Sequence, residues 1–257
     1  MNDRIEWPVD LSRQRVVVTG AASGMGAAIA EAFAREGARV AFADLAGDMI
    51  SEKAASLSSQ GCDVIALEGD VSDRTTVAGW AETIAERWEA ATTLVNCAGI
   101  WSDVPFEELS VDEWQRVIDV NLTGSFHTCQ LIGGPMRFAG GGSIVNFSSL
   151  SGVRGFKRRA AYTVTKHGVV GLTRVIAHEW GEFGVRANAI GPGRFDTALA
   201  AEKYADPAVA KKFLERVPIG RIAAADEIVG TIFFLASEMS AYLTGQLLMV
   251  DGGFTAA

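Results

Sequence analysis

Tyr162 and Lys166 stand four residues apart in the segment RRAAYTVTKHGVVGL, residues 158–172. On a helix, this spacing places both side chains on one face. A tyrosine titrates at about pH 10, and a nearby positive charge lowers its pKa. The pair therefore predicts a phenol, with its pKa lowered by Lys166, that exchanges a proton with an alcohol or alkoxide. Because an isolated pair of this kind is more often a surface pair without chemistry, the surrounding residues must decide.

Two polar residues elsewhere in the chain supply that context. Ser149 ends the apolar run GSIVNFSS, thirteen residues before Tyr162. A hydroxyl at the end of a strand can hydrogen-bond and polarise a substrate oxygen. Asn121 lies within the helical pattern of DVNLTGS, where an amide is unfavourable if it is buried without partners. We interpret the Asn121 amide as the holder of a water that links Lys166 to solvent; the alternative is a plain packing contact.

A glycine-rich turn, TGAASGMG, follows the apolar run RVVVT and contains Gly20, Gly24 and Gly26. Glycines let the backbone turn sharply and approach a ligand closely. The free N–H groups and positive dipole end of the helix that follows suit a diphosphate. The turn, with its Ser23 and Met25, therefore predicts a dinucleotide site.

Asp44 ends the second apolar run, RVAFAD. An acid at this position of a dinucleotide fold accepts hydrogen bonds from ribose hydroxyls and repels a 2′-phosphate. The residues between Gly20 and Gly26 include no Lys or Arg that could hold such a phosphate. These features favour NAD over NADP, and a solvated acid at the strand end is the alternative.

Short β-branched runs alternate along the chain with longer segments of helical apolar spacing. The predicted strands are residues 15–19, 39–44, 63–69, 92–99, 142–149, 185–191 and 246–253, and the predicted helices are residues 27–37, 49–60, 76–90, 111–133, 161–184 and 226–238. This alternation predicts the α/β class: a single Rossmann-like, doubly wound domain over residues 1–257, with a seven-stranded parallel sheet and helices on both faces. Open α/β sheets bind ligands at the carboxyl ends of their strands. We therefore add to the cofactor site the residues that close the third and fourth strands: Asp70, Val71, Asn96, Ala98 and Gly99.

The sequence gives fewer indications of the substrate-binding residues than of the cofactor-binding residues. Residues 194–224 fit no simple strand–helix unit, and we predict a substrate-binding lid there, with a surface helical hairpin as the alternative. Arg159 and Arg194 flank the expected cleft, and a planar guanidinium suits a carboxylate, sulfonate or phosphate of the substrate. Alternatively, the basic run at 157–159 is a solvated loop or pairs with acids. Trp101 either lines the pocket or anchors its loop.

The overall composition excludes several classes of function. The formal net charge of −8 argues against general binding of nucleic acid or of an acidic membrane. The three cysteines are widely spaced and predict a reduced compartment and no metal site. The first residues are polar, unlike a signal peptide, and no apolar run is long enough to span a bilayer. We therefore expect a cytoplasmic protein.

With these motifs in place, the chain resembles the short-chain dehydrogenase/reductase family in its classical NAD-dependent form, from Val16 to about Phe254. The resemblance rests on TGAASGMG, NCAG, IGPGRFDT and TGQLLMVDGG, and on Asn121, Ser149, Tyr162 and Lys166 in the family's catalytic order. It implies that Pro192, Gly193, Phe195 and Thr197 meet the nicotinamide, Phe195 through its backbone. It also implies that Lys166 holds the nicotinamide ribose, and that the protein is a homotetramer.

The expected activity is therefore NAD-dependent interconversion of a secondary alcohol and a ketone. The substrate is expected to be a polar or anionic hydroxy compound: a hydroxy acid, a sugar acid or a sulfonate. Because a fold does not fix its reaction, two alternatives stay open: a reductase of a C=C or imine bond, and a dehydrogenase of neutral polyols or sugars.

Overall fold

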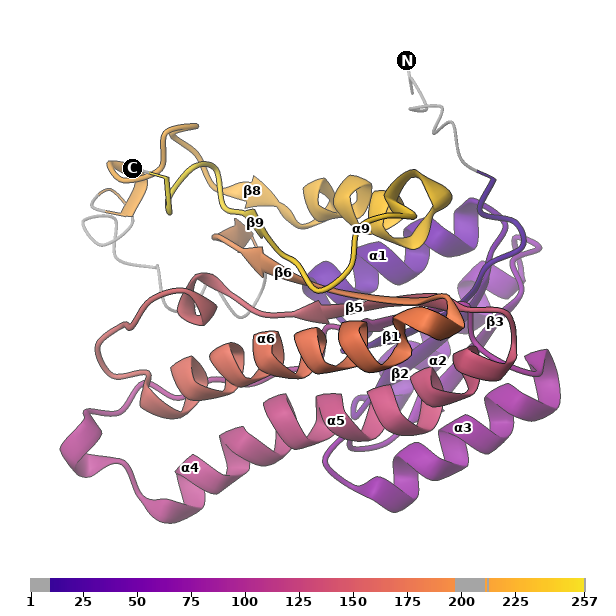
Figure 1. The fold of residues 1–257 in the computed structure, drawn as a ribbon, viewed down its shortest axis with the longest axis horizontal. Helices are drawn as coiled ribbons and strands as arrows, with labels where there is room; N and C mark the ends of the chain where they lie inside the picture. Colours follow the sequence, from indigo (N-terminus) through magenta and orange to yellow (C-terminus); the bar gives the residue numbers. More distant parts are fainter. Residues whose placement is uncertain (1–9, 197–210, 212, 257) are drawn as a thin grey trace.

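The computed structural model describes residues 10–196, 211 and 213–256. Its main sheet has seven parallel strands in the order β3-β2-β1-β4-β5-β6-β9 (Figure 1). The strands are β1 Arg15–Thr19, β2 Arg39–Asp44, β3 Val64–Glu68, β4 Thr93–Asn96, β5 Gly142–Phe147, β6 Val185–Pro192 and β9 Leu247–Val250. The predicted α/β class, with its seven-stranded parallel sheet, is confirmed. The strand order reverses between β1 and β4, and such a switch point opens a crevice at the carboxyl ends of the strands.

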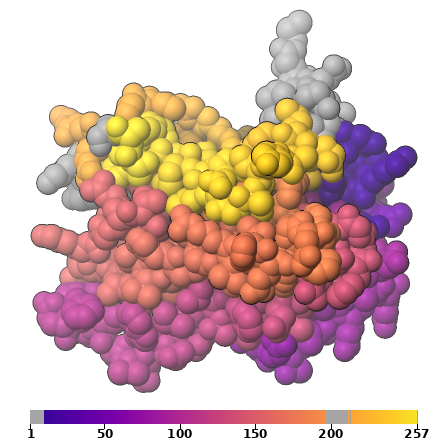
Figure 2. Space-filling model, viewed as in Figure 1, coloured from indigo at the N-terminus to yellow at the C-terminus, as the bar shows by residue number. Residues whose placement is uncertain are grey.

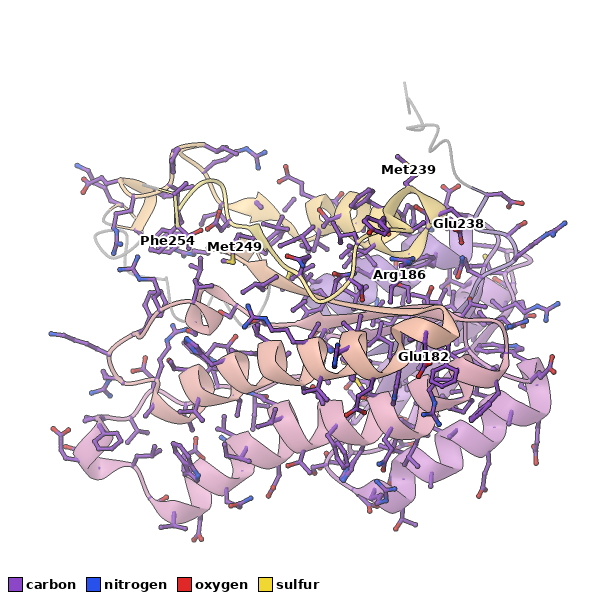
Figure 3. The ribbon with its side chains drawn as sticks, in the orientation of Figure 1. Glu182, Arg186, Glu238, Met239, Met249 and Phe254 are labelled. Atoms are coloured by element: carbon purple, nitrogen blue, oxygen red, sulfur yellow. The ribbon has the colours of Figure 1, made fainter. Side chains whose placement is uncertain are left out.

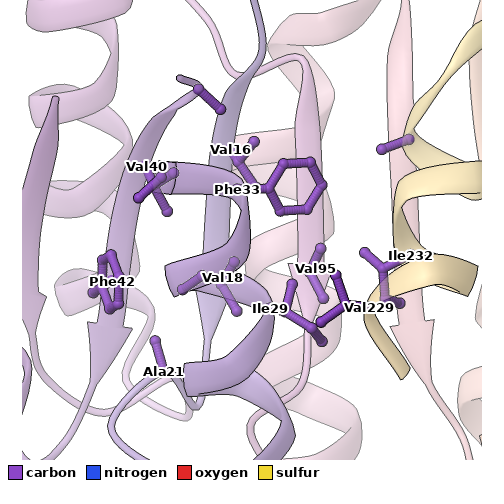
Figure 4. Close-up of a cluster of buried hydrophobic side chains, with 14 of the residues drawn as sticks. Val16, Val18, Ala21, Ile29, Phe33, Val40, Phe42, Val95, Val229 and Ile232 are labelled. Carbon is purple, nitrogen blue, oxygen red and sulfur yellow. The ribbon is translucent and has the colours of Figure 1, made fainter. Parts of the chain in front are cut away.

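Helices cover both faces of the sheet. One face carries α1 Gly24–Arg35, α2 Gly47–Ser58 and α9 Val229–Ala236, and the other carries α3 Arg74–Trp88, α5 Gly124–Thr128 and α6 Ala160–Trp180. On the first face, Phe33 of α1 and Ile232 of α9 pack on Val16 and Val95 (Figure 4). Strands buried on both faces need apolar side chains throughout, which explains the uninterrupted run RVVVT in β1.

The long helix expected at 111–133 is divided in the structure. It consists of α4 Val111–Ile118, a π-helical turn Asp119–Thr123, α5, and a second π-helical turn Cys129–Gly133. A π-helical turn inserts a residue into the helix and often marks a functional site. Asn121 lies at the centre of the first such turn.

Short 3₁₀ turns connect the remaining elements: Phe106–Glu108, Gly134–Phe138, Leu150–Gly152, Gly181–Phe183, Ala225–Ile228 and Glu238–Ser240. A separate two-stranded sheet pairs β7 Phe195–Asp196 with β8 Ala223–Ala224. These two strands bring together the two ends of the predicted lid. About half of the predicted lid, residues 197–210 and 212, lies outside the described residues, so its role stays a prediction.

Within residues 10–196, 211 and 213–256, no helix is both long and apolar enough to cross a membrane. The same part of the chain has no group of three His, Cys, Asp or Glu side chains placed to hold a metal ion.

Candidate active site

Tyr162 and Lys166 lie on the first turns of α6, at the carboxyl edge of the sheet. The Lys166 Nζ lies 5.5 Å from the centre of the Tyr162 ring, so the two side chains share a face as the spacing predicts. Lys166 is 4% exposed, and its Nζ donates a hydrogen bond of 2.7 Å to the carbonyl oxygen of Phe147, the last residue of β5. The ammonium is thereby fixed between strand and helix.

Ser149 stands two residues beyond the end of β5 and joins the same group. A hydrogen bond with the Ser149 side chain lowers the pKa of Tyr162, and so does the charge of Arg159. Burial has the larger effect and raises the pKa of the Tyr162 phenol above its ordinary value. The expected net lowering by Lys166 is therefore wrong for the chain by itself. The physical reason is that the phenolate would have to lose its water before it gains the charge of Lys166.

Lys166 is itself changed by its position. Burial lowers the pKa of its ammonium to about 8. The single hydrogen bond to Phe147 does not replace the water that surrounds an exposed ammonium. At neutral pH this group is charged, yet it is close to losing its proton.

The Asn121 amide is fully buried and holds the loop that follows β4. Its Oδ1 accepts a hydrogen bond of 2.8 Å from the backbone N–H of Ile100, and its Nδ2 donates one of 2.7 Å to the carbonyl oxygen of Ile100. A Cβ built on Gly99 would lie 3.2 Å from the Asn121 Oδ1 and 3.5 Å from the Lys166 Nζ. Asn121, Gly99 and Lys166 thus meet at one point. That Asn121 holds a water stays a prediction, because its side-chain amide is hydrogen-bonded to the backbone of Ile100.

The glycine turn is packed against the end of β4. Gly20 has a φ of +72°, and a Cβ there would lie 2.8 Å from the backbone nitrogen of Ala98. A Cβ on Gly26 would overlap the carbonyl oxygen of Gly20. Only glycine allows these approaches. Ser23 precedes α1 without a capping hydrogen bond from its side chain, so Gly24, Met25 and Gly26 present the helix N-terminus to a ligand.

Asp44 ties the glycine turn to the end of β2. Its Oδ2 accepts a hydrogen bond of 3.0 Å from the backbone N–H of Ala22, and its Oδ1 accepts one of 3.0 Å from that of Ala46. A carboxylate offers about four lone-pair sites, so two remain for ribose hydroxyls. Asp44 therefore fits a cofactor while it also shapes the turn.

The remaining predicted cofactor residues line the same edge of the sheet. Asp70 accepts a hydrogen bond from the N–H of Ser72, and the carbonyl oxygen of Val71 lies 3.2 Å from the Nδ1 of His127. Pro192 ends β6, and Phe195 is 4% exposed in β7. The N–H of Gly193 donates to the carbonyl oxygen of Val250. Thr197 lies outside the described residues.

Asn96 is the predicted cofactor residue whose side chain is engaged elsewhere. Its amide donates a hydrogen bond of 2.9 Å to the Asn146 Oδ1 and accepts one of 2.7 Å from the Thr128 hydroxyl. Asn146 in turn donates to Thr173 of α6. This buried network joins β4 and β5 to α5 and α6. A contact between Asn96 and a cofactor must therefore come from its backbone.

The substrate side contains a stacked pair. The Cζ of Arg159 lies 4.1 Å from the centre of the Trp101 ring, and both residues are partly buried. Its neighbour Arg158 forms an ion pair with Asp103, at 2.6 Å. The basic run at 157–159 therefore divides: Arg158 pairs with an acid of its own chain, and Arg159 faces the cleft, close enough for its charge to act on Tyr162. Arg194 lies farther along, with its Cζ 5.6 Å from the Phe213 ring.

A family model described as enoyl-(acyl carrier protein) reductase matches residues 20–255. The chain belongs to the short-chain dehydrogenase/reductase family. It is 38% identical to D-threitol dehydrogenase of Mycolicibacterium smegmatis (98% of this chain, 96% of the relative). It is also 38% identical to trans-4-hydroxycyclohexanecarboxylate dehydrogenase of Sinomonas cyclohexanicum (100% of this chain, 96% of the relative).

A solved structure from Beutenbergia cavernae is described as a candidate NAD(P)-dependent gluconate 5-dehydrogenase with NADP bound at low occupancy. It superimposes with a TM-score of 0.93 at 39% identity, covering 98% of this chain and all of the other. The relatives named here are described as dehydrogenases of hydroxy compounds, and this chain is an oxidoreductase of the short-chain dehydrogenase/reductase family.

Sequence reasoning missed some residues that fix this short-chain dehydrogenase/reductase site. Thr165 receives a hydrogen bond of 3.3 Å from the Asn121 Nδ2 and donates to the carbonyl oxygen of Tyr162. Its spacing of three residues from Tyr162 on a helix was the available signal. The carbonyl groups of Phe147 and Ile100 left no such signal, since backbone atoms carry no residue identity.

Proposed function

We propose that this enzyme is an NAD-dependent dehydrogenase that interconverts a secondary alcohol and a ketone, and that its substrate carries an acidic group. The observation that carries the proposal is the meeting of Ser149, Tyr162 and Lys166 beside the glycine turn at the switch point of the sheet. A proton-transfer group next to a dinucleotide crevice is what alcohol oxidation requires.

In this proposal the glycine turn and Asp44 would hold a nicotinamide dinucleotide, which would supply the acceptor for the hydride of the carbinol carbon. Tyr162 takes the hydroxyl proton in oxidation and returns it to the ketone oxygen in reduction, and Ser149 orients that oxygen by a hydrogen bond. Lys166 holds a positive charge beside the phenolate that forms and binds the nicotinamide ribose. Since burial raises the pKa of Tyr162 in the chain by itself, the charge of an oxidised cofactor assists the loss of its proton.

The residues of the cleft fit a dinucleotide. The close approaches at Gly20 and Gly26 and the uncapped start of α1 suit a diphosphate. Asp44 favours NAD, because its carboxylate repels a 2′-phosphate and retains lone pairs for the ribose hydroxyls. The NADP bound to the Beutenbergia cavernae structure makes this preference a point that must be measured.

Arg159 supports an anionic substrate. Stacking on Trp101 holds the face of the guanidinium and leaves its N–H edge for a carboxylate or sulfonate. The relatives agree in part: hydroxycyclohexanecarboxylate and gluconate are acids, whereas threitol is a neutral polyol. A neutral polyol or sugar is therefore the alternative substrate. Reduction of a C=C bond is the alternative reaction, because it is named in the description of the family model.

We further propose that the enzyme acts as a homotetramer in the cytoplasm and as one domain, with residues 194–224 as a lid. The helices α5 and α6 carry exposed apolar side chains, including Phe126, Val164 and Val175. These side chains support burial of the surface of α5 and α6 between subunits. Neither a nucleic acid nor a membrane belongs to this proposal, in keeping with the net charge of −8.

The test is the Tyr162→Phe variant, assayed by NADH formation at 340 nm with hydroxy acids, sugar acids, hydroxysulfonates and polyols. We expect the wild type to oxidise acidic substrates best. The variant should lose turnover by about 10²–10⁴-fold while it binds NADH as before, because only the proton-transfer group is removed. Near-normal turnover of Tyr162→Phe would contradict the assigned role. NADH formation that is absent with every alcohol but present in reverse with an enone would favour the C=C reductase.

A further inference from the structure

A buried aromatic ring near the C-terminus is flanked by two guanidinium groups. The Cζ of Arg216 lies 4.6 Å from the centre of the Phe254 ring, and the Cζ of Arg154 lies 5.6 Å from the same centre. Phe254 is 1% exposed and packs with Leu150 and Val217. Because Leu150 directly follows Ser149, this ring lies next to the proposed catalytic residues.

The ring joins three segments that are far apart in the sequence. Figure 2 shows the C-terminal segment, in yellow, between the light-orange residues beyond 210 and the salmon-coloured loop after β5. Phe213 stacks on Phe254 with ring centres 5.0 Å apart. Figure 3 places Phe254 beside Met249, and far from Arg186. The two arginines beside the ring, Arg154 and Arg216, are exposed and lie on loops rather than in the core.

Neither guanidinium has an acidic partner in the part of the chain that the structure describes. Over the described residues, no hydrogen bond or ion pair to a carboxylate is formed by the side chain of Arg154 or Arg216. Arg158, by contrast, is paired with Asp103 and Arg221 with Glu227. The acid three residues before Phe254, Asp251, instead accepts hydrogen bonds from the backbone of Gly253 and from Thr255.

The N–H groups of Arg154 and Arg216 are available to a ligand, because both side chains are exposed and neither is paired with a carboxylate among the described residues. A ring occupies the face of a guanidinium, whereas its N–H groups lie in the plane and point away from the ring. The two Cζ atoms cannot be farther apart than the sum of 4.6 Å and 5.6 Å. Both guanidinium groups end long, exposed side chains, so they can converge on one tetrahedral anion through charge-assisted N–H···O bonds of about 2.7–2.9 Å.

We propose that Arg154 and Arg216 form an anion-binding site for a tetrahedral oxyanion group, such as a phosphate or a sulfonate, beside the Phe254 ring. This site is separate from the Arg159–Trp101 pair. The group belongs either to the distal end of a substrate or to a free anion from solution. The binding itself does not depend on the proposed dehydrogenase activity; only the assignment to substrate rests on it.

The probe is inorganic phosphate, titrated by ³¹P NMR into the protein saturated with NADH, which occupies the diphosphate site. All proteins carry Arg159→Gln, so that this second cation cannot contribute. We expect saturable binding that Arg154→Gln/Arg216→Gln weakens at least about tenfold, corresponding to about 1.4 kcal/mol. The matched control is Arg13→Gln/Arg87→Gln, which removes two charges at the opposite edge of the sheet and should bind phosphate unchanged.

Retained NADH binding shows that the variants are folded, and the two single variants should each give a partial loss. The proposal is overturned if phosphate binding is non-saturable, or if Arg154→Gln/Arg216→Gln and the control weaken it equally. Enzyme with Arg159 intact then identifies the source. Competition between phosphate and the best substrate assigns the site to the substrate, whereas a change of kcat without competition assigns it to a free anion. Because the first experiment needs no turnover, an inactive enzyme leaves its result valid.

Discussion

Two regions of the site use their polar groups in opposite ways. We call the first the wall; it consists of Ser149, Tyr162 and Lys166. We call the second the rim; it consists of Trp101, Arg154, Arg159 and Arg216. On the wall, Lys166 is buried and bonded to the backbone of β5. On the rim, the guanidinium groups lie beside aromatic rings, and their N–H groups are available to a ligand. Under the proposed function, the wall therefore sets the chemistry through contacts with the fold itself. Under the same proposal, the rim sets recognition through side chains that can change without disturbing the sheet.

The sharpest way to break this comparison is to remove the charge from the wall. Lys166→Met keeps a long apolar stem but has no ammonium to stabilise the Tyr162 phenolate. We expect kcat to fall by about 10²–10⁴-fold, measured as initial NADH formation at saturating substrate. Lys166→Arg restores a charge in a larger, planar form and should recover only part of the loss. A kcat within about threefold of wild type in Lys166→Met would show that the wall does not act as one unit.

On the rim, Arg159→Gln should change recognition rather than chemistry. We expect kcat/KM for an acidic substrate to fall by about 10–100-fold, the value of one charge-assisted pair, with little change for a neutral polyol. Arg158→Gln is the matched control, because it removes the same charge one residue away from a group already paired with Asp103. Equal losses for acidic and neutral substrates would mean that Arg159 has a structural rather than a selective role.

Asp44 combines a structural role like that of the wall with a recognition role like that of the rim. It holds the glycine turn by hydrogen bonds, and it is also expected to select the cofactor. Asp44→Asn removes the charge but keeps a carbonyl oxygen for the N–H of Ala22 or Ala46. We expect the ratio of kcat/KM for NADP to that for NAD to rise about tenfold as the repulsion of the 2′-phosphate is lost. Isothermal titration with both cofactors gives the same ratio without turnover. An unchanged ratio would remove Asp44 as the determinant.

The wall was largely predictable from the sequence, and the rim was not. The i,i+4 spacing of Tyr162 and Lys166 and the position of Ser149 after an apolar run follow from helix and strand geometry. The glycine turn could also be predicted from the sequence, because the backbone at Gly20 and Gly26 leaves no room for a Cβ.

By contrast, the stacking of Arg154 and Arg216 on Phe254 joins segments that no local pattern connects. The π-helical turn around Asn121 was also missed, because its apolar spacing is close to that of an ordinary helix. The direction of the Tyr162 pKa was predicted wrongly, because burial depends on the whole fold and not on one neighbouring charge.

A further expected effect is on the free energy of unfolding, and it also separates the wall from the rim. Burial lowers the pKa of Lys166 to about 8, whereas an unfolded lysine titrates at about 10.4. Between these values the unfolded chain binds a proton that the folded chain does not, so the free energy of unfolding gains a term that rises with pH. The slope of this term is at most about 1.4 kcal/mol per pH unit. Below about pH 8 both states are protonated, and the penalty of the buried charge is constant and largest.

Lys166→Met should lack this rise, whereas Arg159→Gln should keep it, because the guanidinium of Arg159 stays charged in both states. Urea unfolding of the three proteins at a series of pH values between about 7 and 10 measures the difference in slope. If wild type and Lys166→Met gave parallel curves, the ammonium would not be desolvated in the folded protein. A divergent pair would show that the group that supports catalysis also destabilises the fold, as expected for a buried charge with a single hydrogen bond.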